Sequence, residues 1–136
     1  MIKLLLFVLF MLFSPLGVAA QVIAHPSVPL EQLTHSQLRA VFSMRQTQWP
    51  DGNLVRVFVL ASDHPAHQEF CKEQLRMFPY QLDSIWNRLS FSGIGTRPQQ
   101  VTSEQEMQQM IQATPGGIGY RLRSDEQIGV KIIEII

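Results

Sequence analysis

The sequence predicts a single α/β domain, in which helices cover both faces of a largely parallel sheet to give three layers. Strand-like apolar runs alternate along the chain with amphipathic segments, which is the order expected of an α/β domain. The clearest strand is predicted at 54–60, where the unbroken apolar run at 57–60 is typical of a strand covered on both faces. The 136 residues leave room for one such domain and not two.

The first twenty residues have the pattern of a signal peptide. Lys3 is followed by an apolar stretch at 4–13, and the small residues Val18 and Ala20 occupy the −3 and −1 positions of a cleavage site. We therefore expect a signal peptide at 1–20 and an exported, periplasmic domain at 21–136. The residue after the cleavage site is Gln21 and not cysteine, so no lipid anchor is expected. A retained N-terminal anchor is the alternative, for which the apolar stretch is short.

Charge and cysteine content exclude several classes of protein. Removal of Lys3 with the leader leaves 10 Lys+Arg against 11 Asp+Glu, which argues against a nucleic-acid-binding protein. No later stretch approaches the roughly 18 apolar residues of a membrane span. The single cysteine, Cys71, excludes an internal disulfide and a multi-cysteine zinc site. We expect Cys71 to pack in the core beside Phe70, the alternative being a reactive thiol.

The first half of the domain is predicted from a short strand, a capped helix and a turn. The strand is expected at 22–24, where His25 and Pro26 stop it. The segment 34–37 reads Thr-His-Ser-Gln, a capping box that opens a helix with Phe42 on its apolar face. The turn at 49–53 contains Pro and Gly and precedes the strand at 54–60.

The second half is predicted as three helices and two strands. Pro65 begins a helix that reaches about residue 77, and a second helix begins near Pro79. Trp86 lies on the apolar stripe of this second helix, which ends at a loop spanning 90–100. A capping box at 103–106 opens the last helix, and strands follow at 118–122 and within 128–136.

The first candidate site lies between the strand at 54–60 and the helix that follows it. Ser62, Asp63, His64 and His67 gather where the strand ends and the helix begins, a place that favours bound anions in α/β sheets. The alternative is an ordinary helix N-cap, for which Ser and Asp are common. The two histidines with Asp63 also suggest a metal, but a third, separate ligand is lacking, so neither a metal nor another cofactor is expected.

The second candidate site is the glycine-containing loop at 92–98. Thr96 and Arg97 follow two glycines, an arrangement that could hold an anion with backbone amides and a guanidinium. The pattern matches neither a P-loop nor a dinucleotide fingerprint, and a structural connection is the alternative. No pairing of a nucleophile with a base is recognisable, so no catalytic residue is assigned and the protein is not expected to be an enzyme.

Three blocks of sequence, in order, resemble a known family. The segment 33–43 contains Leu-Thr, Gln-Leu and Val-Phe steps, 49–52 reads Trp-Pro-Asp-Gly, and 114–120 reads Thr-Pro-Gly-Gly-Ile-Gly-Tyr. Together they resemble the phosphate-binding solute receptors of ABC transporters, in the type 2 periplasmic binding protein superfamily. Removing twenty of the 136 residues leaves 116, enough for only one of the family's two lobes. The resemblance therefore implies a one-lobed protein.

The anion loop departs from the family's pattern. Leu60 stands at the position of an arginine, and His64, Pro65 and Ala66 stand where the family has Ser-Gly-Thr. Pro65 has no amide to donate and Ala66 has no hydroxyl, so we expect phosphate or another small anion to bind weakly. The alternative function is an interaction module, whose cleft face docks a periplasmic or envelope protein or a second copy of the chain.

Overall fold

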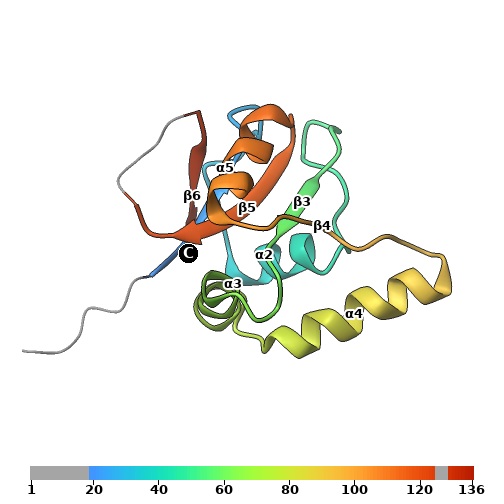
Figure 1. Ribbon diagram of the computed structural model, residues 1–136. Coiled ribbons are helices and arrows are strands. Elements are labelled where there is room, and N and C mark those ends of the chain that lie inside the picture. The colour runs from blue at the N-terminus through green and yellow to red at the C-terminus, as the bar shows by residue number, and fades with distance from the viewer. Residues whose placement is uncertain (1–18, 125–128) are drawn as a thin grey trace, which may run out of the picture.

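The computed structural model describes residues 19–124 and 129–136 (Figure 1). Its strands are β1 (Ala20–Ala24), β2 (Gln32–Leu33), β3 (Arg56–Val59), β4 (Gln99–Gln100), β5 (Gly117–Leu122) and β6 (Lys131–Ile135). Its helices are α2 (His35–Phe42), α3 (Pro65–Phe70), the π-helical turn η1 (Cys71–Leu75), α4 (Pro79–Ser92) and α5 (Glu104–Ala113). The predicted signal peptide lies outside the described residues, apart from its last two.

The strands form one six-stranded sheet in the order β2-β6-β1-β5-β3-β4. Pairing is parallel between β2 and β6, β3 and β5, and β3 and β4. β1 runs antiparallel to both of its neighbours, β5 and β6, so the predicted α/β fold is confirmed with a sheet of mixed direction. The sequence did not predict the antiparallel direction of β1, because the apolar residues of so short a strand carry no signal of its direction.

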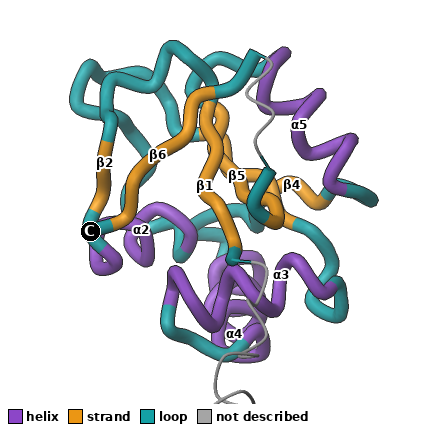
Figure 2. Tube along the Cα trace, turned by 90° about the vertical axis from the view of Figure 1, so that its left-hand side faces the viewer, coloured by secondary structure: helices purple, strands orange, loops and turns teal. Residues whose placement is uncertain are grey.

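β5 separates the two helical layers because its side chains alternate between the faces of the sheet. On one face, a Cβ added to Gly119 would lie 2.5 Å from the Sδ of Met107, so α5 packs closely here. On the other face, the ring of Tyr120 stacks on Phe70 of α3 at 4.1 Å and lies 6.1 Å from the ring of Phe42 of α2. The strands therefore lie between α5 and the pair α2 and α3 (Figure 2).

The helix boundaries follow local signals. The predicted capping box at Thr34 and Gln37 is present, and Pro65 and Pro79 each occupy the first turn of a helix. The helix predicted from Pro65 to about residue 77 is divided, because α3 changes to the π-helical turn η1 and ends at Arg76 with a φ of 54°. α4 lies along the lower edge of the molecule in Figure 1, with only Leu82 and Trp86 buried.

The first residues of the described chain are hydrogen-bonded to the rest of the domain. Ala20 is buried in β1, and its amide donates to Oε2 of Glu73 at 3.0 Å. Its carbonyl accepts from the side chain of Gln74, also at 3.0 Å. The cleavage point predicted between Ala20 and Gln21 therefore lies inside a strand. Within the described ranges, no helix has the length and apolar character needed to cross a bilayer.

Candidate functional site

The loop that follows β3 is closed by its own backbone and by His64. The apolar run ends at Leu60, and the amide of His64 then donates to the carbonyl of Ala61 at 2.9 Å. His64 is the N-cap of α3, and its Nδ1 accepts from the amide of Ala66 at 3.1 Å. Pro65 has no amide hydrogen, and the amide of Ala66 already donates to His64. The first turn of α3 therefore has fewer free amides for an anion.

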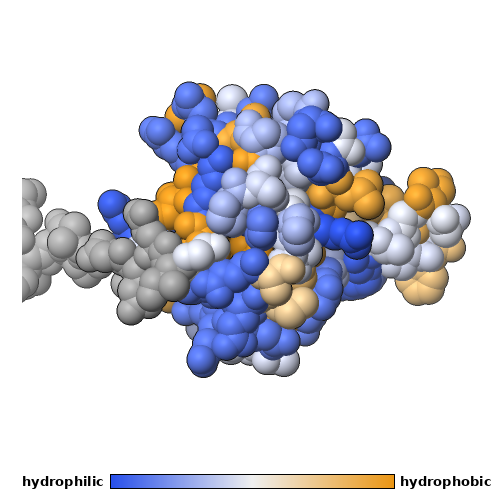
Figure 3. All heavy atoms as spheres, turned by 90° about the horizontal axis from the view of Figure 1, so that it is seen from above, coloured by the Kyte–Doolittle hydropathy of each residue, from blue (hydrophilic) through white to orange (hydrophobic). Residues whose placement is uncertain are grey.

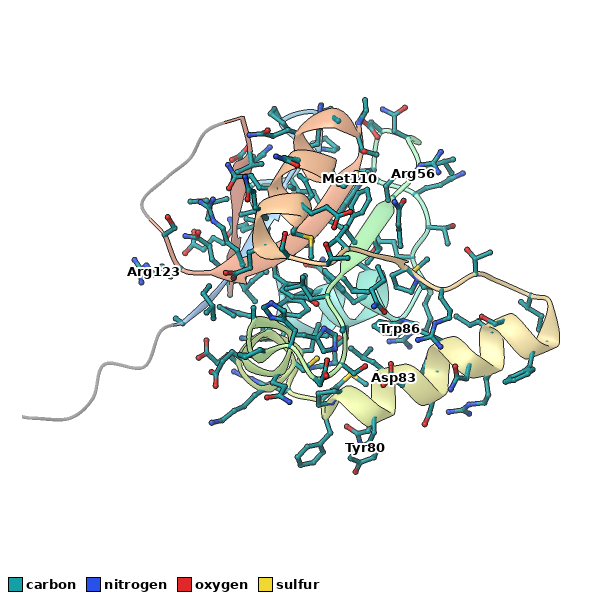
Figure 4. The ribbon with its side chains drawn as sticks, in the orientation of Figure 1. Arg56, Tyr80, Asp83, Trp86, Met110 and Arg123 are labelled. Carbon is teal, nitrogen blue, oxygen red and sulfur yellow. The ribbon has the colours of Figure 1, made fainter. Side chains whose placement is uncertain are left out.

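The two loops proposed from the sequence meet at a residue that the sequence analysis missed, Asp83 of α4. Ser62 donates its hydroxyl to Oδ2 of Asp83 at 2.7 Å, and Nη2 of Arg97 lies 3.6 Å from Oδ1. The Arg97 guanidinium also bonds the side-chain oxygen of Asn87 and lies 5.7 Å from the centre of the Trp86 ring. Asp83 and Trp86 lie on the side of α4 that faces the sheet (Figure 4). A carboxylate on that side of a helix needs polar partners. The place of Asp83 beside the apolar stripe of this helix was therefore the sequence signal that could have identified it.

His67 lies in the core and away from the loop surface. Its side chain is fully buried, and its Nδ1 is hydrogen-bonded to the hydroxyl of Tyr120. The same hydroxyl accepts from the amide of Leu60 at 2.8 Å, while Nε2 of His67 lies 3.4 Å from Sγ of Cys71. All of these groups are satisfied when the Tyr120 hydroxyl donates to Nδ1 and the Nε2 proton points to the sulfur.

Burial keeps each member of this chain of hydrogen bonds uncharged. Desolvation lowers the pKa of His67, with the Asp83 carboxylate opposing the shift and His64 adding to it. Burial, and secondarily Asp83, raises the pKa of the Cys71 thiol to about 12, and burial also raises the pKa of Tyr120. A neutral imidazole beside a protonated thiol is not an activated nucleophile. The arrangement holds the core together instead.

The remaining candidates are Thr96 and Asp63. Thr96 lines a hollow of about 220 Å³ together with Arg97 and with Arg56, which begins β3 at the end opposite the loop. Asp63 is exposed beside Ser62. Among residues 19–124 and 129–136, no three His, Cys, Asp or Glu side chains are grouped so that they could hold a metal ion.

The fold is shared with known phosphate-transport proteins. An ABC-type phosphate transport receptor from Vibrio cholerae matches 86% of this chain with a TM-score of 0.62 and 14% identity. A phosphate ABC transporter substrate-binding protein from Clostridium perfringens, solved with bound phosphate, matches 86% with a TM-score of 0.59 and 15% identity. PstS from Borrelia burgdorferi matches 86% with a TM-score of 0.57 and 14% identity. No family model and no curated protein matches the sequence.

The chain spans less than half the length of these receptors, with 46%, 44% and 47% of each covered. At such low identity the match concerns the fold and not the ligand. The resemblance inferred from three sequence blocks is confirmed at that level: this chain has the fold of one lobe of a phosphate-binding receptor.

Proposed function

We propose that this protein is an exported, periplasmic binding lobe, related to the phosphate receptors of ABC transporters, that holds phosphate or a similar small anion only weakly. The observation that carries this proposal is the bonding of the loop after β3. Ser62 is bound to Asp83, Arg97 to Asp83 and Asn87, and His64 to the amide of Ala66. The groups that would contact an anion are thus already bonded to other residues, and the carboxylates of Asp63 and Asp83 lie nearby.

The buried position of Leu60 supports the weakness of binding. Its side chain is 2% exposed, so an arginine there would point into the core. Ala61 is only partly buried, and a long side chain from that position could reach the loop surface. A charge-assisted hydrogen bond contributes on the order of 1.5–3 kcal/mol, so the absence of one such donor weakens binding by about one to two decades.

Calorimetric titration with inorganic phosphate at neutral pH tests the proposal. We expect a dissociation constant in the millimolar range or no measurable heat, while a two-lobed receptor titrated in parallel binds tightly. Sub-micromolar affinity for this chain would overturn the proposal. The double variant Ala61→Arg with Pro65→Ser should bind phosphate about tenfold or more tightly, since it adds a guanidinium and an amide. Ala113→Arg adds the same charge on the exposed end of α5 and should have no effect.

Export is tested by the N-terminus of the protein recovered from cells. Cleavage after Ala20, as the sequence predicts, removes the hydrogen bond between the Ala20 amide and Glu73. Cleavage one residue earlier keeps this bond and turns the amide into an ammonium beside the carboxylate. N-terminal sequencing distinguishes Gln21 from Ala20 as first residue, and a product that still begins at Met1 would contradict export.

A second candidate function, docking to another protein or to a second copy, rests on the far end of α4. Phe91 and Ile94 are 91% and 84% exposed there. Apolar side chains gather at this end of the molecule, on the right of Figure 3. An exposed apolar patch of this kind marks an interaction surface. Light scattering at about 100 µM tests whether a second copy is the partner: a dimer mass supports self-association, and a monomer mass contradicts it.

A further inference from the structure

A hollow of about 560 Å³ lies where η1 meets the start of α4. One wall carries Gln68, Lys72 and Arg76, which follow one another at intervals of four along α3 and η1. The rest of the lining is a largely apolar wall, formed by Met77, Phe78, Pro79 and Gln81. The hollow lies at the other end of α3–η1 from the loop of Ser62 and His64, so it is separate from the site discussed above.

The charged side chains that line this hollow are of one sign. Lys72 and Arg76 line it, and Nη2 of Arg76 also lies 3.3 Å from Nε2 of His35. A second hollow of about 430 Å³, which shares Met77, is lined by Arg39, Arg45 and Arg88. Together, the two hollows hold five of the eleven Lys and Arg residues of the chain, and among the described residues no Asp or Glu lines either hollow.

Nearby carboxylates are held elsewhere. Glu73 accepts from the Ala20 amide, and Asp83 is bonded to Ser62 and Arg97. The start of α4, a helix of 14 residues, adds the positive end of its dipole at Pro79. The positive charge of the hollow therefore favours an anionic ligand.

The apolar wall is open to solvent. Phe78 and Tyr80 stack at 5.5 Å with an angle of 10° between their rings, although they are 64% and 65% exposed. Tyr80 points away from the body of the molecule (Figure 4). A stacked aromatic pair beside a flexible methionine offers an apolar ligand both a flat face and an adaptable one.

We propose that this hollow binds a small amphiphilic anion, with an aromatic or aliphatic body and a single sulfonate, carboxylate or phosphate group. The body packs against Met77 and Phe78, and the anionic group lies between Lys72 and Arg76. This assignment does not depend on phosphate binding at the loop after β3, because the two places share no residue.

Fluorescence titration with two dyes tests the proposal. Anilinonaphthalene sulfonate carries the anionic group, and phenylnaphthylamine is its neutral counterpart. We expect one saturable site that binds the sulfonate about tenfold more tightly than the neutral dye. Lys72→Gln combined with Arg76→Asn should abolish that preference, since each exposed charge contributes up to about fivefold. Asparagine tolerates the positive φ of Arg76, so the variant keeps the end of η1. Phe78→Ser should weaken both dyes.

Two matched variants serve as controls. Arg45→Gln removes a cation from the neighbouring hollow, and Phe91→Ser removes an exposed aromatic ring at the far end of α4. Both should leave the titrations unchanged, and equal urea midpoints should show that every variant is folded. Equal affinity for the two dyes, failure to saturate, or loss of binding in Phe91→Ser would overturn the proposal.

Discussion

The buried hydroxyl of Tyr120 gives the sharpest test of how the core is held together. This hydroxyl accepts from the Leu60 amide at 2.8 Å and is bonded to Nδ1 of His67, and Tyr120 is fully buried. In Tyr120→Phe the ring stays stacked on Phe70 while both partners lose their hydrogen bond. A buried polar group left without a partner costs about 1–3 kcal/mol, so the two together should lower the free energy of unfolding by about 2–6 kcal/mol.

Urea denaturation followed by circular dichroism measures this change, with the midpoint and slope compared between variants. Tyr80→Phe is the matched control, because it removes the same atom from a ring that is 65% exposed. Its effect should stay within about 0.5 kcal/mol. A Tyr120→Phe loss below about 1 kcal/mol, or one equal to that of the control, would refute the role assigned to the hydroxyl.

Three further predictions follow from buried or constrained groups. Since burial lowers the pKa of His67, protonation favours the unfolded chain below its ordinary value of about 6.5, so stability should fall from about pH 6.5 to 5. In His67→Asn, the urea midpoint should depend less on pH between about 6.5 and 5. An unchanged slope would contradict the assignment of this pH dependence to His67. The Cys71 thiol, with a pKa of about 12, should not react with Ellman's reagent at about pH 8 until urea exposes it. Gly116→Ala should unfold at far lower urea than Gly52→Ala: both glycines have positive φ, but only at Gly116 would the Cβ meet a backbone oxygen, that of Leu54, at 2.2 Å.

Local chemistry was enough to predict most helix starts. The capping box at Thr34 acts on amides within three residues, and the prolines at 65 and 79 fix the backbone angle of their own positions. The burial of Phe42, Trp86 and Cys71 also followed from neighbouring apolar residues. Signals of this range can be read without knowledge of the rest of the chain.

Features set by distant contacts could not be predicted in the same way. The direction of β1 depends on β5 and β6, which lie about a hundred residues later in the sequence. The change from α3 to a π-helical turn at Cys71 has no proline or glycine to announce it. The sequence predicts His67 in the first turn of the helix as part of the anion site, because the hydroxyl that holds it in the core belongs to Tyr120, 53 residues away.

The polar residues near the loop after β3 also attach α4 to the rest of the molecule. α4 buries only Leu82 and Trp86, which is little apolar contact for a helix of 14 residues. Asp83 adds a hydrogen bond from Ser62 and an ion pair with Arg97, and so fastens the inner side of the helix to the loops on either side of it. An anion at this place would have to compete with a carboxylate already bound to the same donors. We therefore expect tight anion binding here to require the release of α4 from Ser62 and Arg97, which is the physical reason for the weak binding that we propose.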